Sequence, residues 1–324
     1  MKDGGLISVV IPTYNRARAV TAALDSVLSQ TYSNWEAIVV DDGSTDDTQQ
    51  ALQRFISEHF ERGKDIHCLL QSNQGPSAAR NCGIAQARGT WIAFLDSDDV
   101  WLPEKLQWQF RAMQAFDCGA CTTDVVLKNF SDRDATAFRE SGRSYESILG
   151  IDSAAVANLA KSFSHYWLSA LMARATLVRD VGGFDAFADF MEDHDLTFRL
   201  ALATSFCYVN KPLAQIDRAA SPPGSVCRPW DRPEVRLKSQ QAMFEKWLRS
   251  DTISPSVRRA VTRNLRSVHS SWTNWYLGQG RYKEARQSAV RALEYGLAPA
   301  LAVKWLVTQL TPGLARKLSP KIQG

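Results

Sequence analysis

The sequence has no long apolar stretch, and this absence excludes a protein that crosses a membrane with apolar helices. Its apolar runs stop before they reach the length that a membrane-spanning helix needs, about 20 residues. The chain starts with a polar lead and a strand-like run, whereas a secretory signal peptide has a basic start followed by an apolar helix. We therefore expect a cytoplasmic protein.

Cysteines are few and irregularly spaced, which argues against a disulfide-based fold. The chain has six: Cys68, Cys82, Cys118, Cys121, Cys207 and Cys227. Cys118 and Cys121 form a lone C-x-x-C pair without a second pair or a nearby histidine, so we interpret them as strand or loop residues and not as zinc ligands. Cysteines without a regular spacing favour a reducing compartment over secretion. The net charge of +4 is small, so we expect no nucleic-acid partner.

What is present is a series of short apolar runs that alternate with helix-like segments. The runs at 6–13, 35–40, 66–70 and 91–95 have the length and composition of buried strands. Each gap between them carries apolar residues at helical spacing or a Gly-Pro-Ser helix start. This alternation predicts an α/β fold, with a parallel sheet covered by helices on both faces.

Polar clusters follow three of these predicted strands. They are Thr13-Tyr14-Asn15-Arg16, Asp41-Asp42 and Asp96-Ser97-Asp98. Because parallel strands place their carboxyl ends at one edge of the sheet, we expect the three clusters to converge there, where open α/β sheets bind ligands.

The third cluster allows two interpretations. By itself, Asp96-Ser97-Asp98-Asp99 is a turn that caps a helix beginning near Pro103, since short acidic motifs often match by chance. However, carboxylates this close repel one another unless a cation neutralises them. A hard divalent ion that also binds phosphate would do so. The two other clusters at the same edge favour this second interpretation.

Five sequence blocks, taken together, are more specific than any one of them. They are 9–16 (VVIPTYNR), 39–46 (VVDDGSTD), 75–83 (GPSAARNCG), 94–99 (FLDSDD) and 182–199, which contains GGFD and EDHDLTFR. In order and spacing they resemble the family 2 glycosyltransferases, and the resemblance covers about residues 6–210. It implies the GT-A fold, a Rossmann-like mixed sheet with helices on both faces.

The resemblance implies that the strand ends bind a nucleotide-sugar donor. Pro12 and Tyr14 then wall the base, and Asp42 accepts a hydrogen bond from its edge, as suits the imide N–H of uracil. Arg80 contacts the base as well. The implied donor-binding set is Pro12, Thr13, Tyr14, Arg16, Asp42, Arg80, Asp96 and Ser97. Asp41 is expected to orient its loop, and the alternative for Arg80 is an exposed helix residue.

The resemblance also implies a metal ion and a catalytic base. Asp98 would bind Mg²⁺ or Mn²⁺ on the diphosphate, and Asp96 would reach the metal or the ribose. Asp99 is an extra acid that we expect to cap the following helix. Asp193 is the expected base for the acceptor hydroxyl, with Glu192 as the second choice. The alternative for both is that acids in a first helical turn favour the helix dipole.

Residues 117–171 carry no clear pattern. Polar clusters at 131–134 and 139–143 indicate loops, and a strand is expected at 168–172. In the resembling family this region shapes the acceptor pocket, but the residues do not identify the acceptor. We interpret His165 as a structural residue, with metal or acceptor binding as the alternative.

The C-terminal part departs from the resemblance. We divide the chain into a GT-A domain at 1–217, a Pro-rich linker or lid at 218–233 and a helical region at 234–324. Helices are expected at 234–249, 255–279, 282–295 and 299–310. Residues 280–293 resemble half of a tetratricopeptide unit, which cannot bury its own face and should pack on the catalytic domain or on another subunit. The dense basic and aromatic residues indicate either an anionic membrane surface or a helical bundle with a charged face.

The resemblance implies an inverting, metal-dependent glycosyltransferase that uses a nucleotide-diphosphate sugar, with UDP expected. Its acceptor would be a glycan or a lipid-linked sugar in cell-surface polysaccharide synthesis, so peripheral attachment to the inner face of the cytoplasmic membrane stays open. A sugar-nucleotide nucleotidyltransferase would need a Gly-rich basic loop where residues 12–15 stand. The other alternative is an inactive nucleotide-binding scaffold that acts through its helical tail, and the presence of all the expected acids argues against it.

Overall fold

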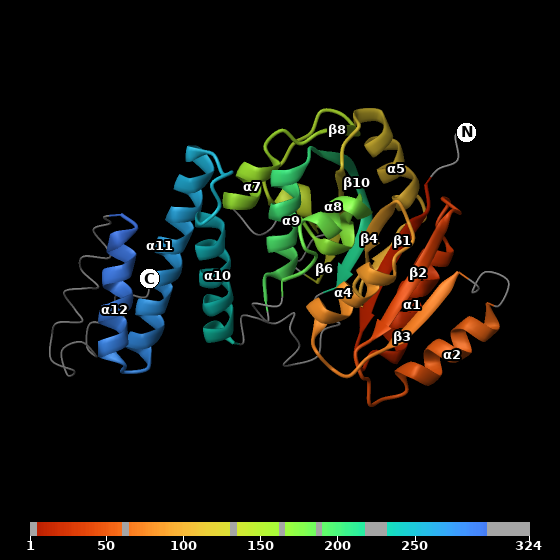
Figure 1. The fold of residues 1–324 in the computed structure, drawn as a ribbon, viewed down its shortest axis with the longest axis horizontal. Coiled ribbons are helices and arrows are strands. Elements are labelled where there is room, and N and C mark those ends of the chain that lie inside the picture. The colour runs from red at the N-terminus through yellow and green to blue at the C-terminus, as the bar shows by residue number, and fades with distance from the viewer. Residues whose placement is uncertain are drawn as a thin grey trace. The chain divides into compact units, whose positions relative to one another are not determined.

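The computed structural model describes residues 5–59, 65–129, 135–161, 166–185, 190–217 and 232–296. The chain divides into two compact units (Figure 1). The first consists of Met1–Ala186 with Glu192–Cys227, and the second of Phe187–Met191 with Arg228–Gly324.

The first unit is built on a sheet whose first half is parallel. Its strands are β1 (Ile7–Thr13), β2 (Trp35–Asp41), β3 (Ile66–Leu70) and β4 (Trp91–Phe94), in the order β3-β2-β1-β4. β1 pairs in parallel with both β2 and β4, and its register places Thr13 beside Asp41. The four strands predicted from the apolar runs are confirmed, and their carboxyl ends lie at one edge.

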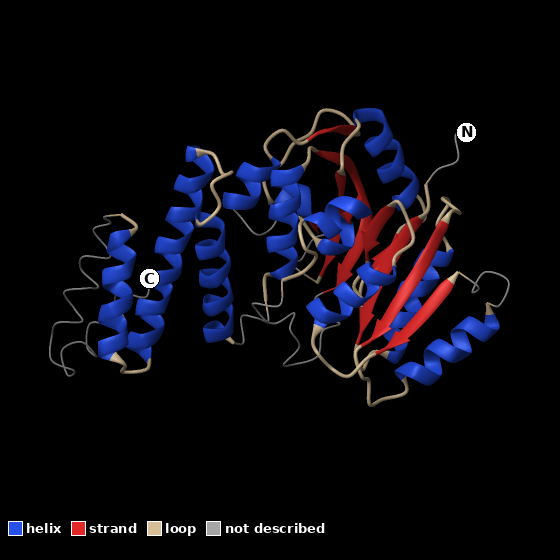
Figure 2. Cartoon of the chain, in the orientation of Figure 1, coloured by secondary structure: helices blue, strands red, loops and turns tan. Residues whose placement is uncertain are grey.

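Successive side chains of β1 face opposite sides of the sheet, and both sides carry helices (Figure 2). The helices of this half are α1 (Ala17–Leu28), α2 (Thr48–Glu58) and α4 (Pro76–Gln86). Ile7 and Val9 belong to a core that also contains residues of α1 and α2. Val10 faces α4, where a Cβ on Gly83 would come within 2.5 Å of Val10 Cγ1. Gly83 therefore allows α4 to pack closely, and the predicted two-sided arrangement is confirmed.

Beyond β4 the sheet continues in the order β9-β6-β10-β5. These strands are β9 (Leu171–Arg174), β6 (Ala120–Lys128), β10 (Phe206–Asp217) and β5 (Val100–Trp101), with β7 (Ala135–Thr136) beside β6 and β8 (Leu149–Ile151) beside β10. β9 is antiparallel to β4 and β6, whereas β6 and β10 are parallel, so the sheet is mixed as the resemblance implied. β6 lies where we predicted irregular structure, and that prediction was wrong. Thr122, Thr123 and Asp124 interrupt its apolar pattern although all three are buried.

The helices around this second half are α5 (Lys105–Phe116), α6 (Ala137–Glu140), α7 (Ala155–Lys161), α8 (Ala175–Asp180) and α9 (Glu192–Ala203). A 3₁₀ turn, η1 (Leu168–Ala170), followed by β9, replaces the single strand expected at 168–172. Cys121 lies in β6 and Cys118 in the loop before it, which confirms their interpretation as strand or loop residues, and both are buried. His165 lies outside the described residues.

The second unit is helical where it is described. Its helices are α10 (Pro233–Leu248), α11 (Pro255–Gly278) and α12 (Tyr282–Glu294). Ser254 caps α11 by accepting a hydrogen bond from the Val257 N–H. Within the described residues, no helix combines the length and apolarity that crossing a membrane requires. The helix expected at 299–310 and most of the Pro-rich segment lie outside the described residues.

Candidate active site

The loops after β1 and β2 are tied together at the carboxyl edge of the sheet. The Asn15 N–H donates to Ser44 Oγ at 2.8 Å, and Asn15 Oδ1 accepts from the Thr45 N–H at 2.7 Å. Asn15 has a φ of 52°, a conformation that asparagine tolerates better than most residues. These bonds hold the residue after Tyr14, whose own side chain is exposed. Asn15 thus joins the two loops, a role that its position in the sequence did not indicate.

The Asp42 carboxylate is buried, and it accepts three hydrogen bonds from the residues around it. Its Oδ1 accepts from Gln71 Nε2 at 2.7 Å and from the Gln74 N–H at 2.9 Å, and its Oδ2 accepts from the Gly75 N–H at 2.8 Å. These bonds fix the carboxylate at the edge of the sheet. Asp41 orients its own loop, as expected, since its Oδ1 accepts from both the N–H and the hydroxyl of Ser44.

Arg80 lies between two acidic side chains, Asp96 and Glu192, and forms an ion pair with each. Its Nη2 donates to Asp96 Oδ1 at 2.7 Å, and its Nη1 donates to Glu192 Oε1 at 2.8 Å. Burial alone would lower the pKa of Arg80, but the charges of Asp96 and Glu192 outweigh it and raise that pKa. The alternative that Arg80 is an exposed helix residue is wrong, because only 6% of the residue is exposed.

The turn at Gly182-Gly183-Phe184 packs against Arg80 and the neighbouring Asn81. The Asn81 side chain donates to Phe184 O at 2.7 Å and accepts from the Phe184 N–H at 2.8 Å. The Arg80 guanidinium then lies 5.2 Å from the centre of the Phe184 ring. Gly183 has a φ of +64°, and a Cβ there would come within 2.6 Å of Asn81 Oδ1, so glycine is needed at this position.

A second arginine pairs with the other acid of the β4 loop. Arg16 Nη1 donates to Asp98 Oδ2 at 2.8 Å, with both side chains partly buried. Pro12 is half-buried, whereas Thr13 and Ser97 are buried. The predicted residues at the ends of β1 and β4 are therefore brought together, as the topology required.

Asp99 does not cap the next helix, and that expectation was wrong. Helix α5 begins at Lys105, and its N-cap is Glu104. Asp99 is instead buried and accepts a hydrogen bond from the Ser169 hydroxyl, whose oxygen accepts from the Asp96 N–H at 3.1 Å. Burial and the charges of Asp96 and Asp98 raise the pKa of Asp99. Ser169 thus fixes the acidic loop, and no sequence pattern indicated it.

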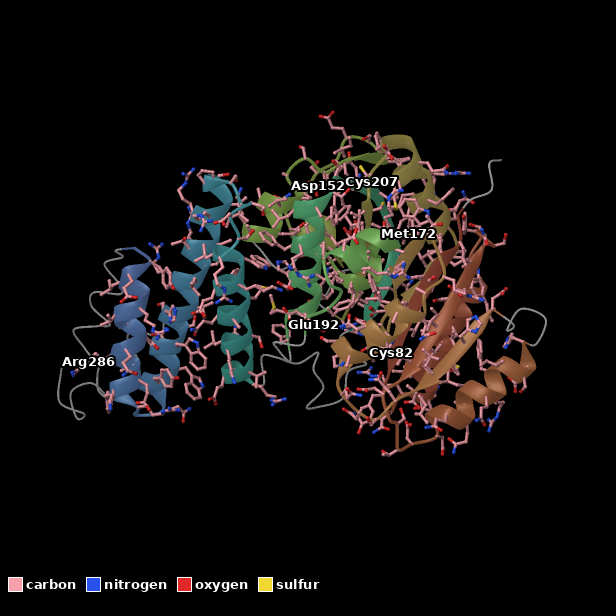
Figure 3. All side chains as sticks on the ribbon, in the orientation of Figure 1. Cys82, Asp152, Met172, Glu192, Cys207 and Arg286 are labelled. Atoms are coloured by element: carbon pink, nitrogen blue, oxygen red, sulfur yellow. The ribbon has the colours of Figure 1, made fainter. Side chains whose placement is uncertain are left out.

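Glu192 and Asp193 open α9, and Glu192 is labelled at the start of that helix in Figure 3. Glu192 is buried against Arg80, whereas Asp193 is only partly buried and its Oδ1 accepts from the His194 N–H at 2.7 Å. Burial raises the pKa of both carboxyls, and Arg80 partly offsets this increase. His194 is buried with Nε2 3.0 Å from Leu159 O, and burial lowers its pKa to about 4. His194 therefore joins α9 to α7 as a neutral side chain.

The residues present fit a divalent cation that is shared with phosphate. Asp96 and Asp98 offer hard carboxylate oxygens at a strand end, which suit Mg²⁺ or Mn²⁺. Across the described parts of the chain there is no group of three or more His, Cys, Asp or Glu side chains that could hold a metal. Among the described residues, Asp96 and Asp98 are thus the carboxylates at this edge that could hold the ion together with diphosphate oxygens and water.

Comparisons with known proteins agree with this geometry. The family model "Glycosyl transferase family 2" matches residues 8–167. The chain is 40% identical over 114 residues to UDP-Glc:alpha-D-GlcNAc-diphosphoundecaprenol beta-1,3-glucosyltransferase WfgD of Escherichia coli, covering 34% of this chain and 42% of that protein. It is 41% identical over 125 residues to the putative teichuronic acid biosynthesis glycosyltransferase TuaG of Bacillus subtilis, covering 38% and 47%. The chain thus spans less than half of each relative.

Solved structures show the same fold over nearly the whole chain. S. aureus TarS 1-349 in complex with UDP-GlcNAc superposes with a TM-score of 0.69 at 18% identity, covering 98% of this chain and 91% of that one. The mannosyltransferase PcManGT from Pyrobaculum calidifontis, in complex with GDP-Man and Mn²⁺, gives a TM-score of 0.61 at 18% identity, covering 99% and 86%. The predicted GT-A fold is confirmed.

Proposed function

Because the chain is a family 2 glycosyltransferase, we propose that it transfers a sugar with inversion from a UDP-sugar to a glycan or lipid-linked acceptor in cell-surface polysaccharide synthesis. The observation that carries this proposal is the Arg80 bridge. One guanidinium contacts Asp96, on the strand end that would hold the donor, and Glu192, in the helical turn that would hold the base. This contact supports a single site in which the acid near the donor and the turn that carries the base lie close together, as a direct displacement would require.

The bonds of Asp42 support uracil over guanine as the base. A carboxylate has about four acceptor positions. Described residues fill two on Oδ1 and one on Oδ2, which leaves one on Oδ2. The single imide N–H of uracil matches one acceptor, whereas guanine presents two adjacent N–H groups on the same edge.

Asp193 is the proposed general base. Its carboxylate would take the proton of the acceptor hydroxyl while that oxygen forms a bond to the anomeric carbon, opposite the breaking bond to the diphosphate. Glu192 is less suited to this role, because its carboxylate is paired with Arg80. A raised pKa also makes the Asp193 carboxylate a stronger base than an exposed one.

Asp98 and Asp96 would hold the Mg²⁺ or Mn²⁺ ion, which offsets the negative charge that develops on the departing diphosphate. Pro12 and Tyr14 would wall the base, and Thr13 and Ser97 would line the donor site between the base and the phosphates. Arg16 pairs with Asp98 from the loop after β1.

We also propose peripheral association with an anionic membrane, because the name of the relative WfgD describes a lipid-linked acceptor. Arg259 and Arg263 lie one turn apart on α11 and are both exposed. A charge-reversed R259E/R263E variant should float less with anionic liposomes than the unchanged chain. Equal flotation of the two proteins would remove these arginines from the proposal.

A thermal-shift screen of nucleotides tests the donor. At a UDP concentration of about 100 times Kd, binding stabilises the fold by about 2.7 kcal/mol, which corresponds to a rise in Tm of roughly 5–10 °C. We expect this rise with UDP and UDP-sugars in the presence of Mn²⁺, and a smaller rise with GDP. An equal or larger rise with GDP would contradict the assignment of the base.

A further inference from the structure

The two arginines of the site differ in how firmly they are held. Arg80 is buried and bridges two acids. The Arg16 side chain is 18% exposed, and its described side-chain partner is Asp98 alone. Arg16 can therefore leave its partner at a smaller cost than Arg80 can, because it is more exposed to water and pairs with one acid instead of two.

The backbone of Arg16 is fixed although its side chain is not. The Arg16 N–H donates to Thr48 Oγ1 at 2.9 Å, and its carbonyl accepts from the Val20 N–H at 3.0 Å. The Asn15 bonds to the loop after β2 hold the preceding residue. A change of partner would therefore require rotation of the Arg16 side chain about a fixed point, without movement of the loop.

Asp98 is also the acid that the proposed function assigns to the metal ion. The Arg16 guanidinium lies 2.8 Å from Asp98 Oδ2, so it already supplies a positive charge to the carboxylate that would hold the ion. A guanidinium bound to Asp98 takes up one of the carboxylate's about four acceptor positions. Its positive charge also repels a second cation placed beside the same carboxylate, so the arginine and the ion compete. A displaced guanidinium has a natural second partner in a diphosphate, which it can bind through two parallel hydrogen bonds.

We propose that Arg16 is an exchangeable counter-ion of Asp98, which the divalent cation displaces onto the diphosphate of the donor. This inference rests on the proposed donor site. It gives Arg16 two opposite effects: it weakens the binding of the metal alone and strengthens the binding of the nucleotide with its metal. Binding of the metal and binding of the donor should then strengthen each other. The metal displaces Arg16 from Asp98, and the displaced Arg16 binds the diphosphate of the donor.

The test measures both affinities in the full chain. Mn²⁺ binding without nucleotide is followed by electron paramagnetic resonance of the free ion, and UDP binding at saturating Mn²⁺ is followed by calorimetry. In Arg16→Gln, Mn²⁺ alone should bind about fivefold more tightly, which is the effect of losing one partly buried ion pair. UDP should bind about tenfold more weakly, through the loss of a charge-assisted contact.

Two variants serve as controls. Arg18→Gln removes the same charge from an exposed position two residues away and should leave both affinities within about twofold. Arg16→Lys keeps the charge and should lie between wild type and Arg16→Gln in both measurements. If Arg16→Gln does not fold, side-chain NMR of the wild type replaces it. The Arg16 Nε–H signal, assigned by its loss in Arg16→Lys, should then shift on addition of Mg²⁺ and again on addition of UDP.

Opposite signs of the two effects support the exchange. Unchanged or weaker Mn²⁺ binding by Arg16→Gln overturns it, as does unchanged UDP binding, an Arg16 signal that ignores Mg²⁺, or the absence of Mn²⁺ binding in both proteins. The proposed function fails separately, if the wild type binds UDP with Mn²⁺ but transfers no sugar to any acceptor. That result would leave the exchange in place.

Discussion

Replacing Arg80 by methionine would remove the cation that lies between Asp96 and Glu192 while keeping most of the side chain's apolar stem. The Glu192 side chain is 9% exposed and would be left as a buried charge without its cation, whereas Asp96, at 31%, is partly solvated. Breaking a buried ion pair costs about 3–5 kcal/mol, and we assign most of this to Glu192. For a domain of this size the loss corresponds to a fall in Tm of roughly 6–20 °C.

The loss should depend on pH in a defined direction. Burial already raises the pKa of Glu192, and Arg80 opposes that rise. Without Arg80 the pKa rises further, so Glu192 of the variant takes up a proton on folding over a wider pH range. A group with a raised pKa in the folded state stabilises the fold at low pH, and this stability is lost as pH rises through the folded pKa. The fall in Tm of Arg80→Met relative to wild type should therefore be larger at pH 8 than at pH 5.

Differential scanning fluorimetry at both pH values measures this directly. Arg54→Met is the matched control, because Arg54 is an exposed residue of α2, and the Tm of this variant should stay within about 2 °C of wild type. Arg80→Lys keeps one charge and should recover part of the loss. A Tm for Arg80→Met within about 2 °C of wild type, or a deficit that grows at low pH, would refute the role given to Arg80.

Three further outcomes follow from the site. Asp98→Asn should weaken Mn²⁺ binding at least about tenfold, and unchanged binding in paramagnetic resonance titrations would place the metal elsewhere. Ser169→Ala removes the hydroxyl that joins the Asp96 N–H to Asp99. Steady-state kinetics should then show a KM for the donor about fivefold higher, with a smaller change in kcat. A loss confined to kcat would argue against a positioning role for Ser169. Because the pKa of Asp193 is raised, kcat/KM should fall on the acid side with an apparent pKa above the usual aspartate value of about 3.9, and a profile flat down to pH 4 would contradict a carboxylate base.

The parallel half of the sheet could be predicted from the sequence because its strands are mainly apolar runs. β1, β2 and β4 are buried on both faces, so the positions before the edge are apolar except Ser8 of β1 and Glu36 of β2, whose side chains hydrogen-bond to each other. The acids then mark the strand ends, and the topology alone places them together. β6 could not be found in this way, since its buried Thr122 and Asp124 read as polar in a one-dimensional pattern.

The contacts that assemble the site could not be predicted, because they join residues far apart in the chain. Arg80 and Glu192 are separated by 112 positions, and Ser169 is 70 positions from Asp99. Sequence spacing gives no information on such distances. The family resemblance supplied the residue types at the ends of the elements, but the burial of Arg80 and the use of Asp99 within the loop came from the packing of α4, α9 and η1.

The most direct test of the account is to replace the proposed base without changing its shape. In Asp193→Asn, kcat for sugar transfer should fall by about 10²–10⁴-fold, the usual contribution of a general base. UDP affinity with Mn²⁺ should stay close to that of wild type, because Asp193 is not part of the proposed donor-binding set. Glu192→Gln is the companion variant, and it should weaken stability more than it weakens the chemical step, because Glu192 is paired with Arg80. Sugar transfer by Asp193→Asn at the wild-type rate would contradict the account.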